Sequence, residues 1–509
     1  MSPDKSTIQP LTWWRAALFA LIAVACFHAA YTPAKSGPLA FGIVGYVICL
    51  VQLARLQTTR QCFYVGLAVG FACFAPQLAF FWKLFGPAAV TLWLILALWI
   101  AFFLVLSHLA LVRLGTKWGA LLVTFLWTGL EYFRCELYYL RFSWLNVGYV
   151  FAESLLTALP FFGMYGIGFI ASLFCGFLYV PGRWRTWLVG GLSLFILYSL
   201  YAQFVWVVAN TKDPRPHVVT AGVQLEHPDE DKIVPALDKV LSTQTNSEIM
   251  ATTHAQYPTN VDIVVLSEYT LDGEPSDALK DWCRTNQKFL VIGGKSPAPG
   301  SNYYNTAFVI STNGEIVFQQ VKSVPIQFFT DGLPAPEQKI WESPWGKIGI
   351  CICYDLSYTR VTDELVRQGA QMLIVPSMDE MHWGKHQHEL HARVAPVRAS
   401  EYGVPIFRVA SSGISQGVSR VGRVLSTAPF PGEEEVIVFG ARLPRNGGTL
   451  PIDRWLAPFC VGVTGIFVAW LAFEFATKKH KPHKTKALVV IILLCLLCLF
   501  VAIHDRILI

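Results

Sequence analysis

The stretch Gly349-Ile350-Cys351-Ile352-Cys353-Tyr354-Asp355 decides how the rest of the chain is interpreted. Its small and β-branched residues are typical of a buried strand, which ends where the polar run Leu356 to Thr359 begins. Because Cys353 comes last, we expect its sulfur at a strand-to-helix turn that faces a cleft, with Cys351 inside the sheet. A thiol attacks as a thiolate, so the site also needs a base and a group that stabilises a developing oxyanion.

Two upstream strand ends offer these groups. Glu268 follows the apolar run Val261 to Leu266, and Lys322 ends the strand-like run Glu315 to Val321. Ligand sites of α/β folds lie at such strand ends. Taken singly, Glu268 is also consistent with a surface carboxylate, and Lys322 with a solvated lysine. Together with Cys353 they predict a site that combines an acid, an amine and a thiol, in that order along the chain.

The composition is that of a membrane protein with one polar insert. Of the 509 residues, 54% are hydrophobic and only 15% are charged, which is too apolar for a purely soluble protein. The net charge of +6 is small for this length, and the basic residues lie between apolar runs, so nucleic-acid binding is not indicated. The polar middle contains three cysteines, Cys283, Cys351 and Cys353. This number and spacing indicate neither a disulfide framework nor a zinc site.

Apolar runs long enough to cross a bilayer, which takes about 20 residues, lie on both sides of the insert. We expect a membrane domain over residues 1–210 with seven transmembrane helices, a polar domain over residues 213–450, and two C-terminal transmembrane helices within residues 455–509. The runs are Trp13 to Tyr31, Pro38 to Ala54, Phe63 to Trp82, Ala88 to Val112, Trp118 to Arg134, Leu159 to Val180, Trp187 to Val208, Trp455 to Ala476 and Ala487 to Ile503.

The basic residues of the short connections predict the orientation, because cytoplasmic loops carry the excess of lysine and arginine. One set holds thirteen basic residues and the opposite set holds five. The N-terminus is therefore expected inside and the polar domain outside, with the loop from Lys478 to Lys486 returned to the cytoplasm. The five are Lys35, Lys83, Arg134, Arg141 and Arg506; the thirteen are Lys5, Arg15, Arg55, Arg60, Arg113, Lys117, Arg183, Arg185, Lys478, Lys479, Lys481, Lys484 and Lys486.

The polar domain has an α/β pattern. Strand-like runs alternate with polar helical stretches, which predicts sheets covered by helices, and Thr312-Asn313-Gly314-Glu315 is a hairpin turn. The expected strands are His217 to Val223, Val261 to Leu266, Phe289 to Gly293, Tyr304 to Ile310, Ile316 to Val321, Ile348 to Cys353, Met372 to Pro376 and Pro405 to Ala410; the helices are Asp231 to Met250, Ser276 to Thr285, Val361 to Gln368 and Lys385 to Ser400.

A cluster of histidines around His388-Glu389-Leu390-His391 resembles a metal site at first sight. The two histidines are three residues apart, whereas the metalloprotease pattern places them four apart so that both face one ion. We therefore expect solvated or hydrogen-bonded histidines and no metal.

The connection from Arg141 to Glu153 is apolar but too short to span a bilayer. It is consistent with an interfacial aromatic belt. The alternative is a lipid-contacting arm under the outer domain, in which Trp144, Gly148 and Tyr149 are the candidate contacts.

The order Glu268, Lys322, Cys353 with Cys353-Tyr354-Asp355 resembles the carbon–nitrogen hydrolase (nitrilase) superfamily. An insert of this kind after several spans is similar to the bacterial apolipoprotein N-acyltransferase family. The stretches that carry the second resemblance are Trp127 to Arg134, Phe142 to Tyr149, Gly163 to Gly166, Val223-Gln224, Tyr304-Asn305 and Ser412 to Ser415.

The resemblance implies a multi-span α-helical membrane domain with an inserted nitrilase-like α-β-β-α sandwich. It implies an acyltransferase that moves an acyl chain from a membrane phospholipid, through a thioester on Cys353, to the α-amino group of a diacylglyceryl-modified lipoprotein. In that scheme Glu268 is the acid/base, Lys322 stabilises the oxyanion, and Tyr354, Asp355 and Ser412 are auxiliary. It further implies a monomer in the bacterial inner membrane, with the catalytic domain on the periplasmic side and no cofactor.

Three positions and one loop depart from the family pattern. Ser267 and Ser143 stand where proline is usual, and Asp355 replaces a glutamate. The loop from Ser323 to Phe329 is shortened and lacks the family's second supporting glutamate.

Two other functions are alternatives to this one. One is a membrane-tethered nitrilase-type amidase that acts on a small amide. The other is a transporter with a large external domain, which should carry ionisable residues near the middle of its spans. Glu131, Arg134 and Glu474 lie instead near span ends, which disfavours the transporter.

Overall fold

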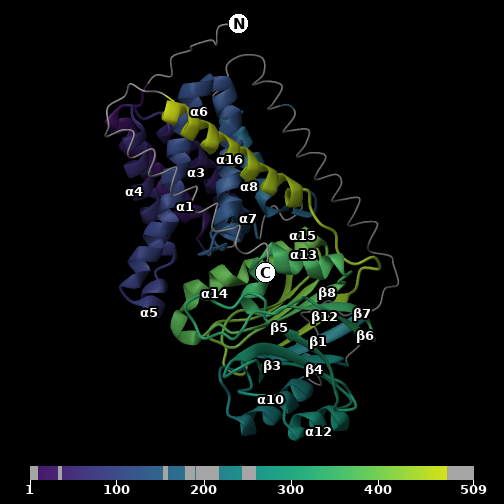
Figure 1. The fold of residues 1–509 in the computed structure, drawn as a ribbon. Helices are drawn as coiled ribbons and strands as arrows, with labels where there is room; N and C mark the ends of the chain where they lie inside the picture. The colour runs from purple at the N-terminus through teal and green to yellow at the C-terminus, as the bar shows by residue number, and fades with distance from the viewer. Residues whose placement is uncertain are drawn as a thin grey trace. The chain divides into compact units, whose positions relative to one another are not determined.

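The computed structural model describes residues 10–32, 37–152, 159–177, 190, 217–243 and 260–477. The chain forms two compact units, which are helical and α/β respectively (Figure 1). The helical unit comprises Met1–Ser154, Phe162–Ala202 and Ile452–Ile509, and the α/β unit comprises Leu155–Phe161 and Gln203–Pro451. The predicted spans Trp187 to Val208 and Ala487 to Ile503, and the loop Lys478 to Lys486, lie outside the described residues.

The helical unit holds apolar helices of membrane-spanning length. Among the described residues, three helices are long and apolar enough to cross a membrane, Trp13–Ala30, Ala88–Leu137 and Asp453–Phe475, and two apolar helices are shorter. The elements are α1 (Trp13–Ala30), α2 (Gly37–Ala40), α3 (Gly42–Leu53), α4 (Thr59–Gln77), α5 (Phe81–Phe85), α6 (Ala88–Tyr132), the π-helix Phe133–Leu137, α7 (Val147–Val150), α8 (Leu159–Phe177) and α16 (Asp453–Thr477).

A glycine divides the longest of these helices. Gly115 in α6 has φ 74° and ψ 177°, a conformation that side-chain-bearing residues rarely adopt. The two halves correspond to the predicted spans Ala88 to Val112 and Trp118 to Arg134. The predicted span Phe63 to Trp82, in contrast, is divided between α4 and α5, so it is not one continuous helix.

Small residues let α4 and α6 approach each other closely. A Cβ atom on Gly66 would lie 2.6 Å from the Ala101 Cα, and one on Gly70 would lie 2.8 Å from the Ala97 Cα. Apolar helices in lipid gain little from hydrophobic burial against one another, so close backbone packing of this kind holds them together.

The α/β unit is a four-layer sandwich, as the resemblance to the nitrilase superfamily implies. Two six-stranded sheets face each other, with orders β12-β1-β2-β3-β4-β5 and β11-β10-β9-β8-β7-β6. The first contains β1 (His217–Val223), β2 (Ile263–Val265), β3 (Phe289–Pro297), β4 (Tyr303–Ile310), β5 (Ile316–Val321) and β12 (Val436–Arg442). The second contains β6 (Ile340–Ser343), β7 (Gly346–Ile350), β8 (Met372–Ser377), β9 (Ile406–Ala410), β10 (Ser415–Val418) and β11 (Val424–Ala428).

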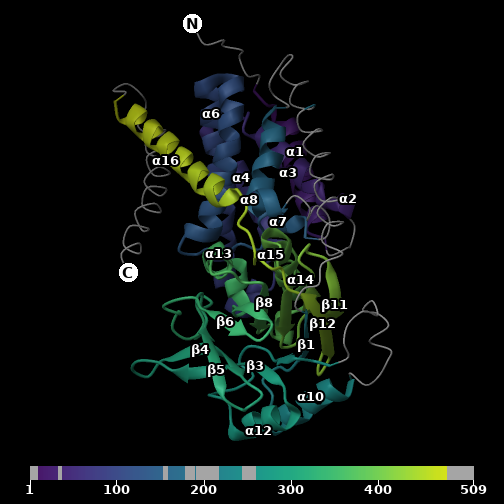
Figure 2. The ribbon, with the colours of Figure 1, turned by 90° about the vertical axis from the view of Figure 1, so that its right-hand side faces the viewer.

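Helices cover the two outer faces of this sandwich. Figures 1 and 2 show α10 (Glu230–Thr243) and α12 (Asp277–Asn286) beside the first sheet, and α13 (Thr359–Arg367) and α15 (Val394–Tyr402) beside the second. The inner faces meet in one core, to which Val265, Ile350 and Phe407 belong. At the centre of each sheet, three neighbouring strands run parallel: β1, β2 and β3 in the first, and β7, β8 and β9 in the second.

Several predicted boundaries need correction. The predicted strand Ile348 to Cys353 ends at Ile350, because Cys353 begins a 3-10 helix, Cys353–Ser357. The predicted helix Lys385 to Ser400 is two helices, α14 (Lys385–Ala392) and α15. Four further strands are absent from the sequence-based prediction: β6, β10, β11 and β12. The hairpin turn is confirmed: Gly314 has φ 74° and joins antiparallel β4 and β5.

Candidate active site

The sandwich brings Glu268, Lys322 and Cys353 into one buried cluster. Glu268 follows β2, Lys322 follows β5, and Cys353 follows β7. Their exposed fractions are 1%, 0% and 2%, so solvent screens the charges very little. The Lys322 Nζ donates to Glu268 Oε1 across 2.7 Å.

A second carboxylate, that of Asp331, also contacts the Lys322 ammonium. Its Oδ2 lies 2.7 Å from the Lys322 Nζ, and its Oδ1 accepts a hydrogen bond from the Tyr269 hydroxyl at 2.8 Å. The Asn305 side-chain amide donates to both acids, at 2.6 Å to Glu268 Oε1 and 2.9 Å to Asp331 Oδ1. Asp331 therefore provides a second acid beside Lys322, although the loop from Ser323 to Phe329 contains none. Its only signal in the sequence was an acidic residue followed by glycine a short way past that lysine.

The two acids differ in their proton affinity. Burial raises the pKa of Glu268, and the negative charge of Asp331 adds to this effect, while Lys322 opposes it. Although burial acts in the same direction on Asp331, the Lys322 ammonium holds the pKa of Asp331 below its usual range. Although burial favours the neutral amine, Asp331 and Glu268 raise the pKa of Lys322. The surroundings therefore push the two pKa values apart: Asp331 stays ionised beside Lys322, whereas Glu268 has the higher affinity for a proton.

Cys353 lies at a strained turn between β7 and the 3-10 helix. Its φ of 50° is uncommon for a side-chain-bearing residue. The Cys353 thiol donates to the Met378 carbonyl oxygen at 3.5 Å, and the Met378 N–H donates to Glu268 Oε2 at 2.8 Å. Burial raises the pKa of the Cys353 thiol, and the Glu268 charge raises it further. The resting thiol is therefore protonated and needs a base at the moment of attack.

Asp355 ties the turn of Cys353 to the loop that follows Lys322. Its carboxylate accepts hydrogen bonds from the N–H groups of Val324 (2.7 Å), Ser323 (3.1 Å) and Ile352 (3.2 Å). Burial raises the pKa of Asp355 to about 6, although Lys322 and the three N–H groups oppose the change. Asp355 therefore lies beside the cluster as a structural link between two of its members.

The other two auxiliary candidates, Tyr354 and Ser412, make contacts of their own. The Tyr354 ring meets the Tyr358 ring edge-on, with centroids 4.9 Å apart, and packs against the core between the sheets. The Ser412 hydroxyl donates to the main-chain oxygen of Asp379 at 2.6 Å.

The histidine cluster is built into a hydrogen-bond network. His391 Nδ1 lies 2.8 Å from Asp379 Oδ1, and His388 Nδ1 lies 2.9 Å from the Gly384 oxygen. Across the part of the chain that the structure describes, no group of three or more His, Cys, Asp and Glu side chains could hold a metal ion.

The candidate lipid arm is packed inside the helical unit. Trp144 and Tyr149 are 6% and 0% exposed, and a Cβ atom on Gly148 would lie 2.4 Å from the Met164 Cβ. A role of these residues in contacting lipid stays a prediction.

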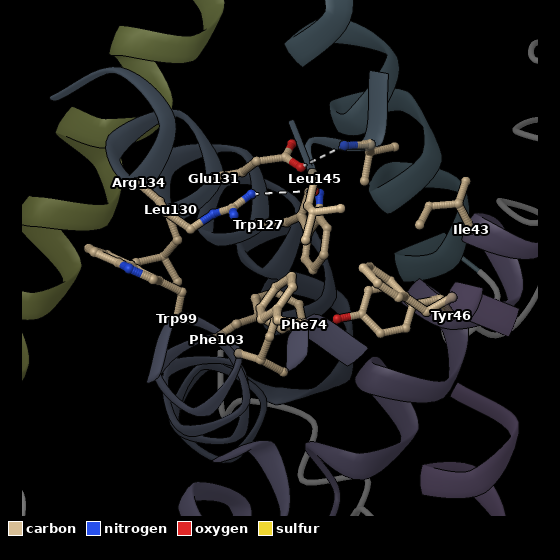
Figure 3. A pocket seen from close by; sticks show the side chains of 13 residues that line it. Ile43, Tyr46, Phe74, Trp99, Phe103, Trp127, Leu130, Glu131, Arg134 and Leu145 are labelled. Atoms are coloured by element: carbon tan, nitrogen blue, oxygen red, sulfur yellow. Dashed lines mark hydrogen bonds between the residues drawn. The ribbon is translucent and has the colours of Figure 1, made fainter. Parts of the chain in front are cut away.

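Two charged side chains hold the turn that precedes α7. Glu131 Oε1 accepts from the Val147 N–H at 3.0 Å, and Arg134 donates to the Leu145 oxygen at 3.5 Å (Figure 3). These contacts border a cavity of about 30 Å³ that Tyr46, Phe74 and other aromatic residues line. Glu131 and Arg134 therefore fix the arm's backbone.

Two facing sheets with a buried acid, amine and thiol define a nitrilase-type enzyme. A family model described as carbon–nitrogen hydrolase matches residues 248–442, which include all three side chains. A second model, described as apolipoprotein N-acyltransferase N-terminal domain, matches residues 23–177. The chain belongs to the apolipoprotein N-acyltransferase family of the carbon–nitrogen hydrolase superfamily.

Individual proteins are similar to all or part of this chain. The apolipoprotein N-acyltransferase of Shewanella oneidensis is 24% identical over 80% of this chain and 85% of its own length. The deaminated glutathione amidase of Dictyostelium discoideum is 28% identical over 30% of this chain and 59% of its own length. A solved amidase from Nesterenkonia sp. has 15% identity and a TM-score of 0.37, over 46% of this chain and 94% of that one.

Proposed function

We propose that this protein is a two-step acyltransferase that moves an acyl chain from a membrane phospholipid to the α-amino group of a lipoprotein's N-terminal diacylglyceryl-cysteine. The observation that carries the proposal is the pairing of one buried Glu268, Lys322 and Cys353 cluster with an N-terminal match to the acyltransferase family. The apolar helices support it, because both substrates carry acyl chains and reach the enzyme from the bilayer.

In the first step, Glu268 takes the Cys353 thiol proton as the sulfur attacks the ester carbonyl carbon. The carbonyl electrons move onto oxygen, and the Lys322 ammonium with main-chain N–H groups near Tyr354 stabilises this oxyanion. The intermediate collapses, the carbon–oxygen ester bond breaks, and Glu268 returns the proton to the departing lysophospholipid oxygen. A thioester on Cys353 remains.

In the second step, the lipoprotein amine attacks the thioester carbonyl. Glu268 takes a proton from the attacking nitrogen, the same donors stabilise the oxyanion, and the carbon–sulfur bond breaks. Cys353 leaves as a thiolate and is reprotonated. Asp331 remains ionised throughout, so that Lys322 keeps its positive charge between two carboxylates.

The experiment follows the mass of the intact protein. The full-length enzyme is incubated with a phospholipid of defined chains, without acceptor. We expect a gain of one acyl chain on Cys353 and release of lysophospholipid. Hydroxylamine, which cleaves thioesters, should remove the added mass.

A membrane-tethered amidase is the second candidate, favoured by the matches of the α/β unit to amidases such as the Dictyostelium discoideum relative. It predicts ammonia release from small amides and no lasting acyl-enzyme with phospholipid. An acyltransferase must exclude water until an amine arrives, so its thioester should persist.

The placement in the membrane is part of the same proposal. We place residues 1–210 and 455–509 in the inner membrane and residues 213–450 on the periplasmic side, on the basis of the uneven distribution of basic residues. Reporter fusions after Val208 and at Lys481 test this. A reporter active in the cytoplasm after Val208 would contradict it.

A further inference from the structure

One short segment after β8 lies between the proposed base and the proposed nucleophile. The Met378 N–H donates to Glu268 Oε2 at 2.8 Å, and the Cys353 thiol donates to the Met378 oxygen at 3.5 Å. The position of Met378 therefore decides how Glu268 and Cys353 face each other. The residue that follows it, Asp379, has no role in the reaction steps above.

The Asp379 side chain is fully buried and held by three polar partners, one of which is the Arg408 guanidinium. Its Oδ1 accepts from Gln387 Nε2 at 3.0 Å and pairs with His391 Nδ1 at 2.8 Å. Its Oδ2 accepts from the Arg408 guanidinium. Although burial opposes it, His391 and Arg408 hold the pKa of Asp379 well below its usual range, so the carboxylate is charged at neutral pH.

The Asp379 main chain is held as firmly as its side chain. Its N–H donates to the Ser411 hydroxyl oxygen at 3.0 Å. Its carbonyl oxygen accepts from the hydroxyls of Ser411 (2.9 Å) and Ser412 (2.6 Å). The Asp379 N–H belongs to the same peptide group as the Met378 carbonyl oxygen. These bonds therefore also fix the Met378 groups that contact Glu268 and Cys353.

We propose that Asp379, anchored by Arg408 and His391, is a positioning residue that holds the Met378 peptide so that the Glu268 carboxylate and the Cys353 thiol converge. The inference rests on the proposed function, since it takes Glu268 as the base and Cys353 as the nucleophile. Asp379 contacts these residues only through the chain and has no part in bond making. Ser412, whose hydroxyl donates to the Asp379 oxygen, supports the same segment.

The charges around Cys353 give the proposal a distinctive signature. After burial, which has the largest effect, Glu268 and Asp379 raise the pKa of the thiol, and Lys322 and Arg408 lower it. Neutralising Asp379 leaves the Arg408 charge uncompensated, so the thiol pKa should fall. The geometry for acyl transfer should be lost at the same time. Thiol reactivity and acyl transfer are therefore expected to change in opposite directions.

The test is Asp379→Asn in the full-length protein, a change that keeps the side chain's size. Alkylation of Cys353 by iodoacetamide is followed against pH by peptide mass spectrometry. We expect its midpoint to move down by about one pH unit, as loss of a nearby negative charge predicts. Acyl-enzyme formation from phospholipid should slow about 100-fold, as small misplacement of reacting groups does. KM should change by less than about threefold, because no substrate contact is removed.

Asp363→Asn is the matched control. Asp363 is another buried carboxylate of the same unit, which accepts from the Tyr402 hydroxyl at 2.7 Å. Its loss should lower thermal stability and leave the Cys353 midpoint unchanged. Labelling of the buried Cys351 reports unfolding in every sample. If Asp379→Asn does not fold, Ser412→Ala should slow acylation to a smaller extent and leave the alkylation midpoint in place, because it removes one support of the Asp379 main chain and no charge.

Equal behaviour of Asp379→Asn and Asp363→Asn, or a folded Asp379→Asn protein with normal acylation, would overturn the proposal. The alkylation midpoint needs no lipid, so it separates the two ideas. A wild-type protein that takes no acyl chain from phospholipid refutes the proposed function. The shift in the Cys353 midpoint still decides whether Asp379 sets the state of the thiol.

Discussion

The second carboxylate of the cluster gives a quantitative prediction. In Asp331→Asn, Lys322 keeps Glu268 as its one charged partner within the cluster, and Glu268 loses the neighbouring negative charge that raises its pKa. Both acids lie 2.7 Å from the same Nζ, so the two oxygens are within about twice that distance of each other. Two unit charges about 5 Å apart interact by about 3 kcal/mol at an effective dielectric constant of 20. This energy corresponds to about two pKa units.

The direction of the effect follows from the role of Glu268. Glu268 must be ionised to accept the thiol proton, so acylation rises as pH increases through its pKa. Lowering that pKa moves the acid limb of the pH profile to lower pH by one to about two units. It also makes Glu268 a weaker base, so the plateau rate should fall about 10-fold or more.

The assay is the rate of acyl-enzyme formation from phospholipid between pH 4 and about 9, measured by intact mass. Asp331→Glu keeps the charge and is the control, with the acid limb expected near its original position. An acid limb in Asp331→Asn that stays in place, or moves to higher pH, would refute the account of how Asp331 tunes Glu268.

Three further predictions concern other parts of the chain. Cys353→Ala should abolish acylation, whereas Cys351→Ala should retain it and lose about 1 kcal/mol of stability; acylation assays and thermal melts check this, and the reverse ranking would mean that the wrong thiol has been assigned. Asp355→Asn should lower acylation at neutral pH and remove the part of the acid limb near pH 6, because protonated Asp355 cannot accept all its N–H bonds. The pKa of Asp355 in the folded state lies above its usual value, so protonation itself favours the folded state. A melting temperature that falls together with activity between pH 7 and about 5 would therefore argue against this cause. Gly66→Ala should destabilise the helical unit by about 1–3 kcal/mol, whereas Gly462→Ala in α16 should be tolerated because no atom lies within 4 Å of the added Cβ; equal melting temperatures in detergent would contradict the close packing of α4 on α6.

The sequence predicts the site best where a chemically functional residue follows a recognisable strand. Glu268, Lys322 and Cys353 each follow a strand, and strand ends converge in a sandwich, so their meeting could be predicted. Asp331 could not be recognised, because it lies in an irregular loop whose path is set by contacts with Tyr269, Asn305 and Ile326.

The missed strands show a similar limit. β10 contains serine, glutamine and glycine, β11 contains serine and threonine, and both are short, so their pattern is too weak to distinguish from a loop. The end of β7 was misplaced because Cys351-Ile352-Cys353 has strand-like composition, while the backbone at Cys353 turns to φ 50° to present the thiol. That same turn breaks the two-residue periodicity, so Cys351 and Cys353 do not share a face by strand geometry.

The most direct test of the central proposal is the mass of the intact enzyme after exposure to a defined phospholipid without acceptor. The account predicts a gain of one acyl chain, located on Cys353, removed by hydroxylamine, and absent from Cys353→Ala and Glu268→Gln. An enzyme that still N-acylates lipoprotein but never carries a hydroxylamine-labile acyl group on Cys353 would contradict it.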